Sequence, residues 1–269
     1  MSLTAPQKQF YDDNGYILIK GLFSPAEAAD LRQATHDLAA RLQKIRNIDA
    51  TWATAKDVDP TKKISLLHCH DVQFQDARFA RLIVDPRLTS IAQSIIGPNV
   101  QLHHTKMFIK PPEKGAPFPM HQDFPYFPHD NNSMIAAIVH MDDAPIAKGC
   151  LRVVPGSHKL GPIKTDRPDF SLSPEEYPID KATPCEAHAG DVIFFSYLTI
   201  HGSGINVSSE ARTTVLVQMR DPADPPTRRT HESRGQGMML AGHDPTGAVP
   251  RDKPATLTAP AMGAAMGAR

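Results

Sequence analysis

The sequence has little of several features that mark particular classes of protein. Only three of its 269 residues are cysteine, which is too few for a disulfide framework. No stretch approaches the roughly 18 consecutive apolar residues of a membrane-spanning helix. The first residues also lack the basic start and apolar stretch of a secretory signal. From these absences we expect a cytoplasmic protein with reduced thiols.

Net charge is also missing, because 29 Lys and Arg residues balance 29 Asp and Glu residues. Proteins that hold nucleic acids or anionic membranes use a field of positive charge, so we expect neither partner here. Hydrophobic residues make up 41% and charged residues 22%, which is typical of a globular chain with a sizeable core. We therefore expect a small-molecule substrate. Nothing in the sequence indicates an oligomeric state.

Two residue types are plentiful against this background. The chain has 13 histidines and 25 prolines. So many prolines favour short elements joined by turns over long helices, and so many histidines favour a metal site. We therefore expect a β-rich body that binds a metal.

The first part of the chain, 1–98, is predicted to be helical with one early strand at 16–20. A capping box predicts a helix start at Ser24, because Pro25 follows and Glu27 stands three residues after the cap. A second helix is predicted from Asp85 to Ile96, where a Gly-Pro pair ends it. The polar segment 49–63 has no periodic pattern, and we interpret it as a surface loop over a site.

From residue 99 onward, short β-type runs alternate with Pro, Gly and Asn. A series of strands without intervening helices indicates an antiparallel sandwich or jelly roll. We expect one domain over 1–248, with its β core at 99–221, a C-terminal loop or lid at 222–248, and a disordered tail at 249–269. The predicted strands of the core are 100–110, 134–141, 150–154, 182–187, 191–195 and 213–220.

One pair of residues suggests the metal site. On an extended segment residues i and i+2 project from the same face, so His121 and Asp123 would converge on one point. His201, at the end of a long apolar run, would complete the set. Two histidines and one carboxylate form the ligand set of non-haem Fe(II) oxygenases. The alternative is a polar surface pair with no metal.

Arg212 stands eleven residues after His201, where an apolar strand begins. A guanidinium that opens a buried strand needs an anionic partner, because an unpaired buried charge is very costly. That partner is either a carboxylate of the protein, in a structural salt bridge, or a dicarboxylate cosubstrate held by a bidentate contact.

Five motifs in order resemble the phytanoyl-CoA dioxygenase family of Fe(II)- and 2-oxoglutarate-dependent oxygenases. The resemblance covers roughly 7–221, and Lys148 stands where the family usually has Asn. The motifs are a Lys-Met-Phe-Ile-Lys-Pro-Pro segment at 106–112, Met-His-Gln-Asp at 120–123, a Gly-Cys-Leu to Pro-Gly-Ser-His segment at 148–158, Gly-Asp-Val-Ile-Phe-Phe at 190–195, and His-Gly-Ser-Gly at 201–204 followed by Asn206 and Arg212.

The resemblance implies a double-stranded β-helix, the cupin-like jelly roll, with helices packed on one side. It implies that His121, Asp123 and His201 hold Fe(II). It also implies that Arg212 and Ser203 bind the 5-carboxylate of the cosubstrate 2-oxoglutarate. With O2 as second cosubstrate, 2-oxoglutarate would yield succinate and CO2 while an unactivated C–H bond of a small organic molecule is hydroxylated. Related halogenases replace the carboxylate ligand with a small residue, so an aspartate at this position favours hydroxylation.

Two further residues are candidates for the cosubstrate or the substrate. His104 and Lys106 alternate with apolar neighbours, so both would face the barrel interior, together with Phe108, if the apolar side chains pack against helices. The family often has an aromatic residue on the strand after the iron motif, whereas this chain reads Ile-Ala-Ala-Ile-Val-His at 135–140. We therefore expect a pocket of different shape and assign no particular substrate.

Other histidines and arginines have structural interpretations beside functional ones. His158 is either a fourth metal ligand or, as we expect, a residue that hydrogen-bonds within its turn. His68, Cys69 and His70 are either zinc ligands or residues at the mouth of the site. The basic group Arg228, Arg229, His231 and Arg234 is either a solvated face or a lid over an anionic substrate.

Two rival functions fit the same residues. A non-catalytic cupin-like module could hold a metal or ligand in the same barrel without turnover, and a zinc hydrolase could use two histidines and an aspartate. Neither explains why Arg212 and Ser203 stand at these offsets from His201. The oxygenase interpretation explains both.

Overall fold

The computed structural model describes residues 2–45, 48, 66–113, 115–228, 230 and 232–247. The segments predicted as a surface loop, 49–63, and as a disordered tail, 249–269, lie outside the described residues. So do Arg229 and His231 of the basic group. Among the described helices, none has the length and apolar character needed to cross a membrane.

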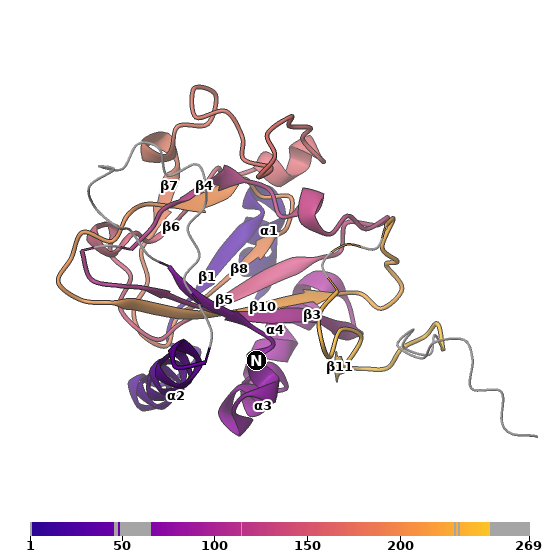
Figure 1. Ribbon diagram of the computed structural model, residues 1–269. Coiled ribbons are helices and arrows are strands. Elements are labelled where there is room, and N and C mark those ends of the chain that lie inside the picture. Colours follow the sequence, from indigo (N-terminus) through magenta and orange to yellow (C-terminus); the bar gives the residue numbers. More distant parts are fainter. Residues whose placement is uncertain are drawn as a thin grey trace, which may run out of the picture.

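Two antiparallel sheets face each other, and Figure 1 shows the smaller one above the larger one. The mainly β class with flanking helices is thereby confirmed. In spatial order the larger sheet runs β1 (Tyr16–Ile19), β8 (Val192–Ser196), β5 (Ile135–His140), β10 (Arg212–Arg220), β3 (Val100–Lys110) and β11 (Met239–Ala241), with β2 (Leu67–His70) also paired to β3. The smaller sheet runs β4 (Phe118–His121), β9 (His201–Ser203), β6 (Leu151–Val153) and β7 (Thr183–Cys185).

Three helices cover the outer face of the larger sheet, at the bottom of Figure 1. The predicted capping box at Ser24 is present: its side chain accepts a hydrogen bond from the backbone of Glu27, whose carboxylate accepts one in return. The α-helices are α1 (Ala5–Asn14), α2 (Pro25–Gln43), α3 (Ala77–Ile83) and α4 (Pro86–Ile96), and α2, α3 and α4 make the covering layer. Short 3₁₀ turns lie at Val72–Phe74, Phe124–Tyr126, Ile146–Lys148, Ser157–Leu160 and Ile179–Lys181.

Successive side chains of β3 point alternately toward the helix layer and toward the space between the sheets. Met107 and Ile109 belong to the large apolar core that also contains the buried faces of the helices. The residues between them point to the opposite face, because successive side chains of a strand alternate. A smaller core, which includes Leu151 and Phe195, packs between the two sheets. The polar side chains of β3 therefore face the interior of the barrel.

The strands of the larger sheet agree better with expectation than those of the smaller sheet. β3 has the predicted bounds, β10 begins one residue earlier than predicted, and β5 and β8 each differ from the prediction by one residue at both ends. The apolar run 191–200 is not one strand, because β8 ends at Ser196 and a turn precedes β9. The short strands β2, β4, β9 and β11 and the helices α1 and α3 were not predicted. β11 lies in the segment expected to be a loop or lid, and it pairs with β3 instead.

Candidate metal and cosubstrate site

Three side chains meet where the smaller sheet faces the larger one. His121 ends β4 and His201 begins β9, and the antiparallel register places the two residues directly opposite each other. Asp123 Oδ1 lies 3.6 Å from Nε2 of His121 and 3.7 Å from Nε2 of His201. Each of the three offers one ligand atom, and these atoms lie within 4.8 Å of one another. Within the described residues this is the one group of three or more such side chains with metal-binding spacing.

The backbone conformation that places Asp123 at this point differs from the predicted one. β4 ends at His121, and the backbone of Asp123 is helical rather than extended. Its N–H donates to the carbonyl oxygen of Tyr197 at 2.9 Å, which holds the turn against the end of β8. The two residues therefore converge because a bonded turn follows the strand, not because an extended segment alternates.

Backbone carbonyls orient both imidazole rings. Nδ1 of His121 lies 2.8 Å from the carbonyl oxygen of Pro119, and Nδ1 of His201 lies 2.9 Å from that of Thr199. A carbonyl can only accept, so each Nδ1 carries a proton, and Nε2 of the neutral ring is the nitrogen left for a metal. Two neutral imidazoles and one carboxylate on the same side of a point suit Fe(II), with coordination positions left for other ligands.

The electrostatics of the three residues suit a cation. Burial, and then the neighbouring His121, lower the pKa of His201 to about 4. Burial acts to raise the pKa of Asp123, but His201 and His121 outweigh it and leave that pKa below its ordinary value. Near neutral pH the site therefore presents a neutral His201 and an ionised carboxylate, the forms in which these side chains bind metals.

A cavity of about 290 Å³ opens beside the three residues and continues between the sheets. Its walls follow the inward-facing positions of β3 and β10, which alternate as the pleat requires. Aromatic and aliphatic side chains from β4, β5, β6 and β8 complete it. The lining residues of β3 and β10 are His104, Lys106, Phe108, Arg212, Thr214, Leu216 and Gln218.

Arg212 lies at the far end of this cavity, as the first residue of β10. It is 6% exposed, and its Nη1 donates to the carbonyl oxygen of Gly149. Its Nε is buried without a hydrogen-bond partner, and no carboxylate among the described residues forms an ion pair with it. Burial lowers its pKa to about 10. A structural salt bridge to Arg212 is therefore not found among the described residues, and its guanidinium lines the cavity without a paired carboxylate.

Ser203 and Lys110 lie next to Arg212. Ser203 lines the cavity on β9, and its Oγ lies 2.8 Å from Nζ of Lys110. Lys110 is fully buried and directly opposite Arg212 in the β3–β10 ladder. Burial, and then Arg212, place the pKa of Lys110 well below its usual value. Sequence reasoning missed Lys110, although the alternation that turned His104 and Lys106 inward also includes it.

His104 and Lys106 lie on the cavity wall. Nδ1 of His104 lies 2.7 Å from Nδ1 of His103, and its ring is 5.7 Å from that of His70, which also lines the cavity. Nζ of Lys106 lies 4.9 Å from the centre of the Phe108 ring. Burial lowers the pKa of Lys106 to about 8.

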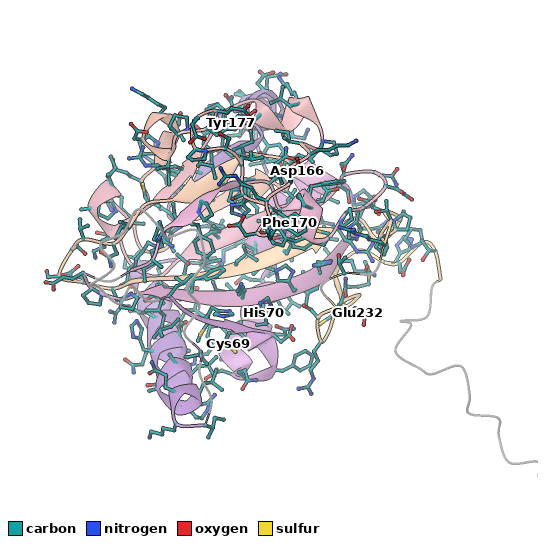
Figure 2. All side chains as sticks on the ribbon, turned by 45° about the horizontal axis from the view of Figure 1, so that its top comes forward. Cys69, His70, Asp166, Phe170, Tyr177 and Glu232 are labelled. Carbon is teal, nitrogen blue, oxygen red and sulfur yellow. The ribbon has the colours of Figure 1, made fainter. Side chains whose placement is uncertain are left out.

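The other sequence candidates lie in different places. His158 bonds to the carbonyl oxygen of Asp12 in α1 at 3.1 Å, which corrects the expectation of a bond within its own turn. On β2, Cys69 packs into the core and His70 faces the cavity, and Figure 2 labels both. Arg228 donates to the carbonyl oxygen of Pro125, and Arg234 stacks 4.2 Å from the centre of the Phe74 ring.

The small size of Gly202 serves strand packing. A Cβ there would lie 2.8 Å from both the carbonyl oxygen of Phe118 and Sδ of Met120, so a side chain would push β4 away from β9. At Gly204 the nearest atom to such a Cβ lies at 3.9 Å, and nothing crowds it. Gly202 therefore makes room for the strand that carries His121.

Comparison with known sequences identifies relatives. Residues 11–214 match the family model of phytanoyl-CoA dioxygenase (PhyH). The peroxisomal phytanoyl-CoA dioxygenase of Bos taurus is 30% identical over 236 residues, which cover 81% of this chain and 69% of that protein. The ectoine dioxygenase of Bordetella parapertussis is 28% identical over 250 residues, covering 84% of this chain and 79% of that protein.

Comparison with solved structures gives the same fold. The non-heme alpha ketoglutarate dependent carbocyclase SnoK from nogalamycin biosynthesis superposes with a TM-score of 0.71 at 19% identity, covering 88% of this chain and 95% of that one. The apoform of EctD from S. alaskensis gives 0.70 at 22% identity, covering 88% and 84%. At these identities the likeness shows the fold, and the predicted jelly roll is confirmed.

Proposed function

The chain belongs to the phytanoyl-CoA dioxygenase family, and from this premise we propose how its site works as that of an Fe(II)- and 2-oxoglutarate-dependent dioxygenase. His121, Asp123 and His201 hold the iron through two Nε2 atoms and one carboxylate oxygen. Arg212 and Ser203 bind the 5-carboxylate of 2-oxoglutarate. The observation that carries this proposal is that Arg212, which is buried and has no ion pair with a carboxylate of the described residues, lines the same cavity as the three metal-binding side chains.

The bound iron and keto acid supply the oxidising chemistry, in which O2 is consumed and 2-oxoglutarate becomes succinate and CO2. The residues of the chain bind the iron and the keto acid and orient them. The Pro119 and Thr199 carbonyls keep Nε2 of each histidine deprotonated and aimed at one point. Arg212 sets how far the diacid enters the cavity, because a guanidinium bonds a carboxylate in a fixed geometry.

The remaining walls of the cavity select the substrate. Phe108, Ile138 and Leu216 present apolar surface, whereas Lys106 and His104 present polar nitrogen atoms. We propose that a small organic molecule carrying both an apolar body and a polar group lies against these walls, with one unactivated C–H bond near the metal, and that this bond is hydroxylated. Ile138 stands on the strand where the family often has an aromatic residue, which gives the substrate more room.

Balanced charge supports a free small molecule over a nucleic acid or a membrane as partner. The three cysteines are buried and form no disulfide, which supports a cytoplasmic location with reduced thiols. A non-catalytic binding module would not need a guanidinium with an unused donor, and neither would a zinc hydrolase. Both rival functions are therefore less favoured.

The test is anaerobic titration of the Fe(II)-loaded protein with 2-oxoglutarate. We expect the weak visible absorption band that arises when a 2-keto acid chelates ferrous iron, and then succinate on admission of O2. Asp123→Ala should lose metal affinity and both signals. If the wild-type protein binds Fe(II) yet shows neither the band nor succinate, the proposal fails and a binding module is favoured.

A further inference from the structure

Lys110 is the buried charge whose role the proposed function leaves open. It is 0% exposed, does not line the cavity, and faces Arg212 directly across the β3–β10 ladder. Like charges directly opposite each other on neighbouring strands are destabilising, and a buried cation without an acid is costly. No carboxylate among the described residues forms an ion pair with either side chain. An anion from outside the chain would favour the charged form of Lys110, whose pKa burial and Arg212 otherwise hold well below its usual value.

Lys110 is connected to the cavity through Ser203. Its Nζ lies 2.8 Å from Oγ of Ser203, also bonds to the carbonyl oxygen of Gly204, and lies 5.8 Å from the centre of the Phe118 ring. When Lys110 is charged, as an anion in the cavity favours, its ammonium group can only donate, so Ser203 Oγ accepts from it. The hydroxyl hydrogen of Ser203 is then left to point away from Lys110, and Ser203 lines the cavity.

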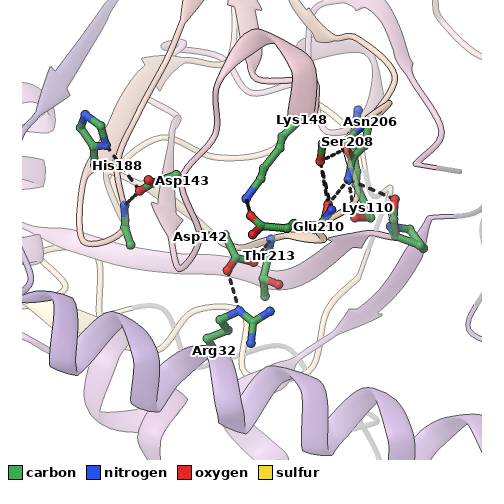
Figure 3. Close-up of polar contacts among 12 residues, drawn as sticks. Arg32, Lys110, Asp142, Asp143, Lys148, His188, Asn206, Ser208, Glu210 and Thr213 are labelled. Atoms are coloured by element: carbon green, nitrogen blue, oxygen red, sulfur yellow. Dashed lines mark hydrogen bonds and ion pairs between the residues drawn. The ribbon is translucent and has the colours of Figure 1, made fainter. Parts of the chain in front are cut away.

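The position of Lys110 is itself secured by Asn206. The amide group of Asn206 donates to the backbone carbonyl oxygens of Lys110 at 3.1 Å, Pro111 at 3.1 Å and Glu210 at 2.7 Å (Figure 3). These bonds tie the end of β3 to the segment between β9 and β10. The ammonium group is therefore held in a fixed place behind Ser203, as a positioning role requires.

We propose that Lys110 is a positioning residue for the cosubstrate: it turns the Ser203 hydroxyl into a donor aimed at the 5-carboxylate and adds a second positive charge behind it. This inference rests on the proposed function, in which 2-oxoglutarate occupies the cavity. Together, Lys110 and Arg212 would make the site select keto acids with a second carboxylate. Lys110 would not strengthen the binding of a keto acid that lacks this carboxylate.

The test compares two keto acids in calorimetric titrations of the Mn(II)-loaded, O2-free protein. 2-Oxoglutarate carries the second carboxylate, and 2-oxopentanoate has the same chain length without it. We expect Lys110→Met to weaken 2-oxoglutarate binding by about tenfold to a hundredfold, which is the effect of losing one charge-assisted hydrogen bond. Binding of 2-oxopentanoate should change by less than about twofold, because neither Lys110 nor Ser203 would contact it.

A double-mutant cycle shows whether Lys110 strengthens 2-oxoglutarate binding through Ser203 or independently of it. Ser203→Ala should weaken 2-oxoglutarate binding in the same direction as Lys110→Met. The double variant should bind 2-oxoglutarate within about twofold of the weaker single variant, because both changes remove one shared interaction. Lys110→Gln, which keeps a polar head without the charge, is the second variant if Lys110→Met does not fold.

Met107→Ala provides the matched control. Met107 is a fully buried residue of the same strand, but it packs into the helix-side core. The Met107→Ala variant should unfold at a lower temperature than the wild type and still bind 2-oxoglutarate in preference to 2-oxopentanoate. If the Lys110 variants weaken both acids equally, or if the two single effects add in the double variant, the inference is overturned. If the wild-type protein shows no preference between the acids, the proposed function itself fails.

Discussion

At the scale of single residues, the site is defined by polar groups that the protein leaves without partners. Arg212 has a donor with no acceptor, and no carboxylate among the described residues forms an ion pair with either it or Lys110. Natural proteins satisfy nearly all buried polar groups, so such an exception asks for an explanation. A dicarboxylate in the cavity provides one, because it supplies both the missing charge and the missing acceptors.

Arg212→Met tests this directly. We expect 2-oxoglutarate binding to weaken by a few kcal/mol, which is roughly the contribution of a charge-assisted bidentate contact, while Fe(II) affinity changes little. Without ligand the variant should unfold at the same or a higher temperature, since an uncompensated buried charge has been removed. Calorimetry and thermal unfolding measure the two effects. Unchanged 2-oxoglutarate affinity with a large loss of stability would mean that Arg212 is purely structural.

His140 predicts a pH dependence of stability. It is buried on the cavity wall, and burial, then Arg212, lower its pKa to about 4. Between pH 6.5 and 4 the unfolded chain protonates this imidazole while the folded protein does not, so acid favours unfolding. The difference amounts to on the order of 3 kcal/mol of unfolding free energy at pH 4.

The measurement is urea unfolding of the metal-free protein at several pH values. Relative to the wild type, His140→Gln should lose less stability between pH 6.5 and 4, by about that amount. Parallel pH profiles of the two proteins would show that His140 does not titrate as described.

At the scale of elements, the strand pair β4–β9 governs the metal site. It is short, yet its register puts His121 opposite His201, and the turn after β4 adds Asp123. Gly202 lies on β9 between His201 and Ser203, lines the cavity, and allows β4 to approach closely. Metal affinity should therefore depend on the spacing of these two strands.

Gly202→Ala should separate β4 from β9 and weaken metal binding by about tenfold or more, because a small displacement of one ligand spoils the geometry. Gly204→Ala is the control, since its Cβ meets no atom closer than 3.9 Å. Neither glycine has a positive φ, so backbone strain does not complicate the comparison. Equal metal affinities in the two variants would show that the spacing of β4 and β9 does not set the site.

Element by element, the sequence predicted long buried strands well and short strands poorly. β3 and β10 carry enough alternating and β-branched residues to stand out. β4, β9 and β11 have only three or four residues each, and pairing with neighbours makes them strands more than their own composition does. His158 illustrates the same limit, because its acceptor lies in α1, 146 positions away in the sequence.

At the scale of the whole molecule, the jelly roll brings together residues that are far apart in the chain. Helices cover one face of the larger sheet, and the smaller sheet covers the other, so the cavity lies between the sheets and away from the helix layer (Figure 1). His121 and His201 are 80 positions apart and meet only because β4 and β9 pair. Motif order and family resemblance predicted that they would lie together. Their role as iron ligands, and that of Arg212 toward the diacid, stays a prediction.

Lys110 shows what the sequence alone did not reveal. It was noted only as part of the motif at 106–112, whereas the fold buries it completely opposite Arg212. Charge balance of this kind depends on distances between strands, which no local pattern contains. The fold class and the metal-binding candidates could thus be anticipated, but the electrostatic surroundings of the cosubstrate could not.

The most direct measurement is anomalous diffraction at the iron edge from crystals loaded without O2 with Fe(II) and 2-oxoglutarate. We expect one iron peak bonded to Nε2 of His121, Nε2 of His201 and a carboxylate oxygen of Asp123. We also expect the 5-carboxylate of the bound diacid to contact Arg212 and Ser203. Iron at another place, or a diacid that does not reach Arg212, would contradict these expectations.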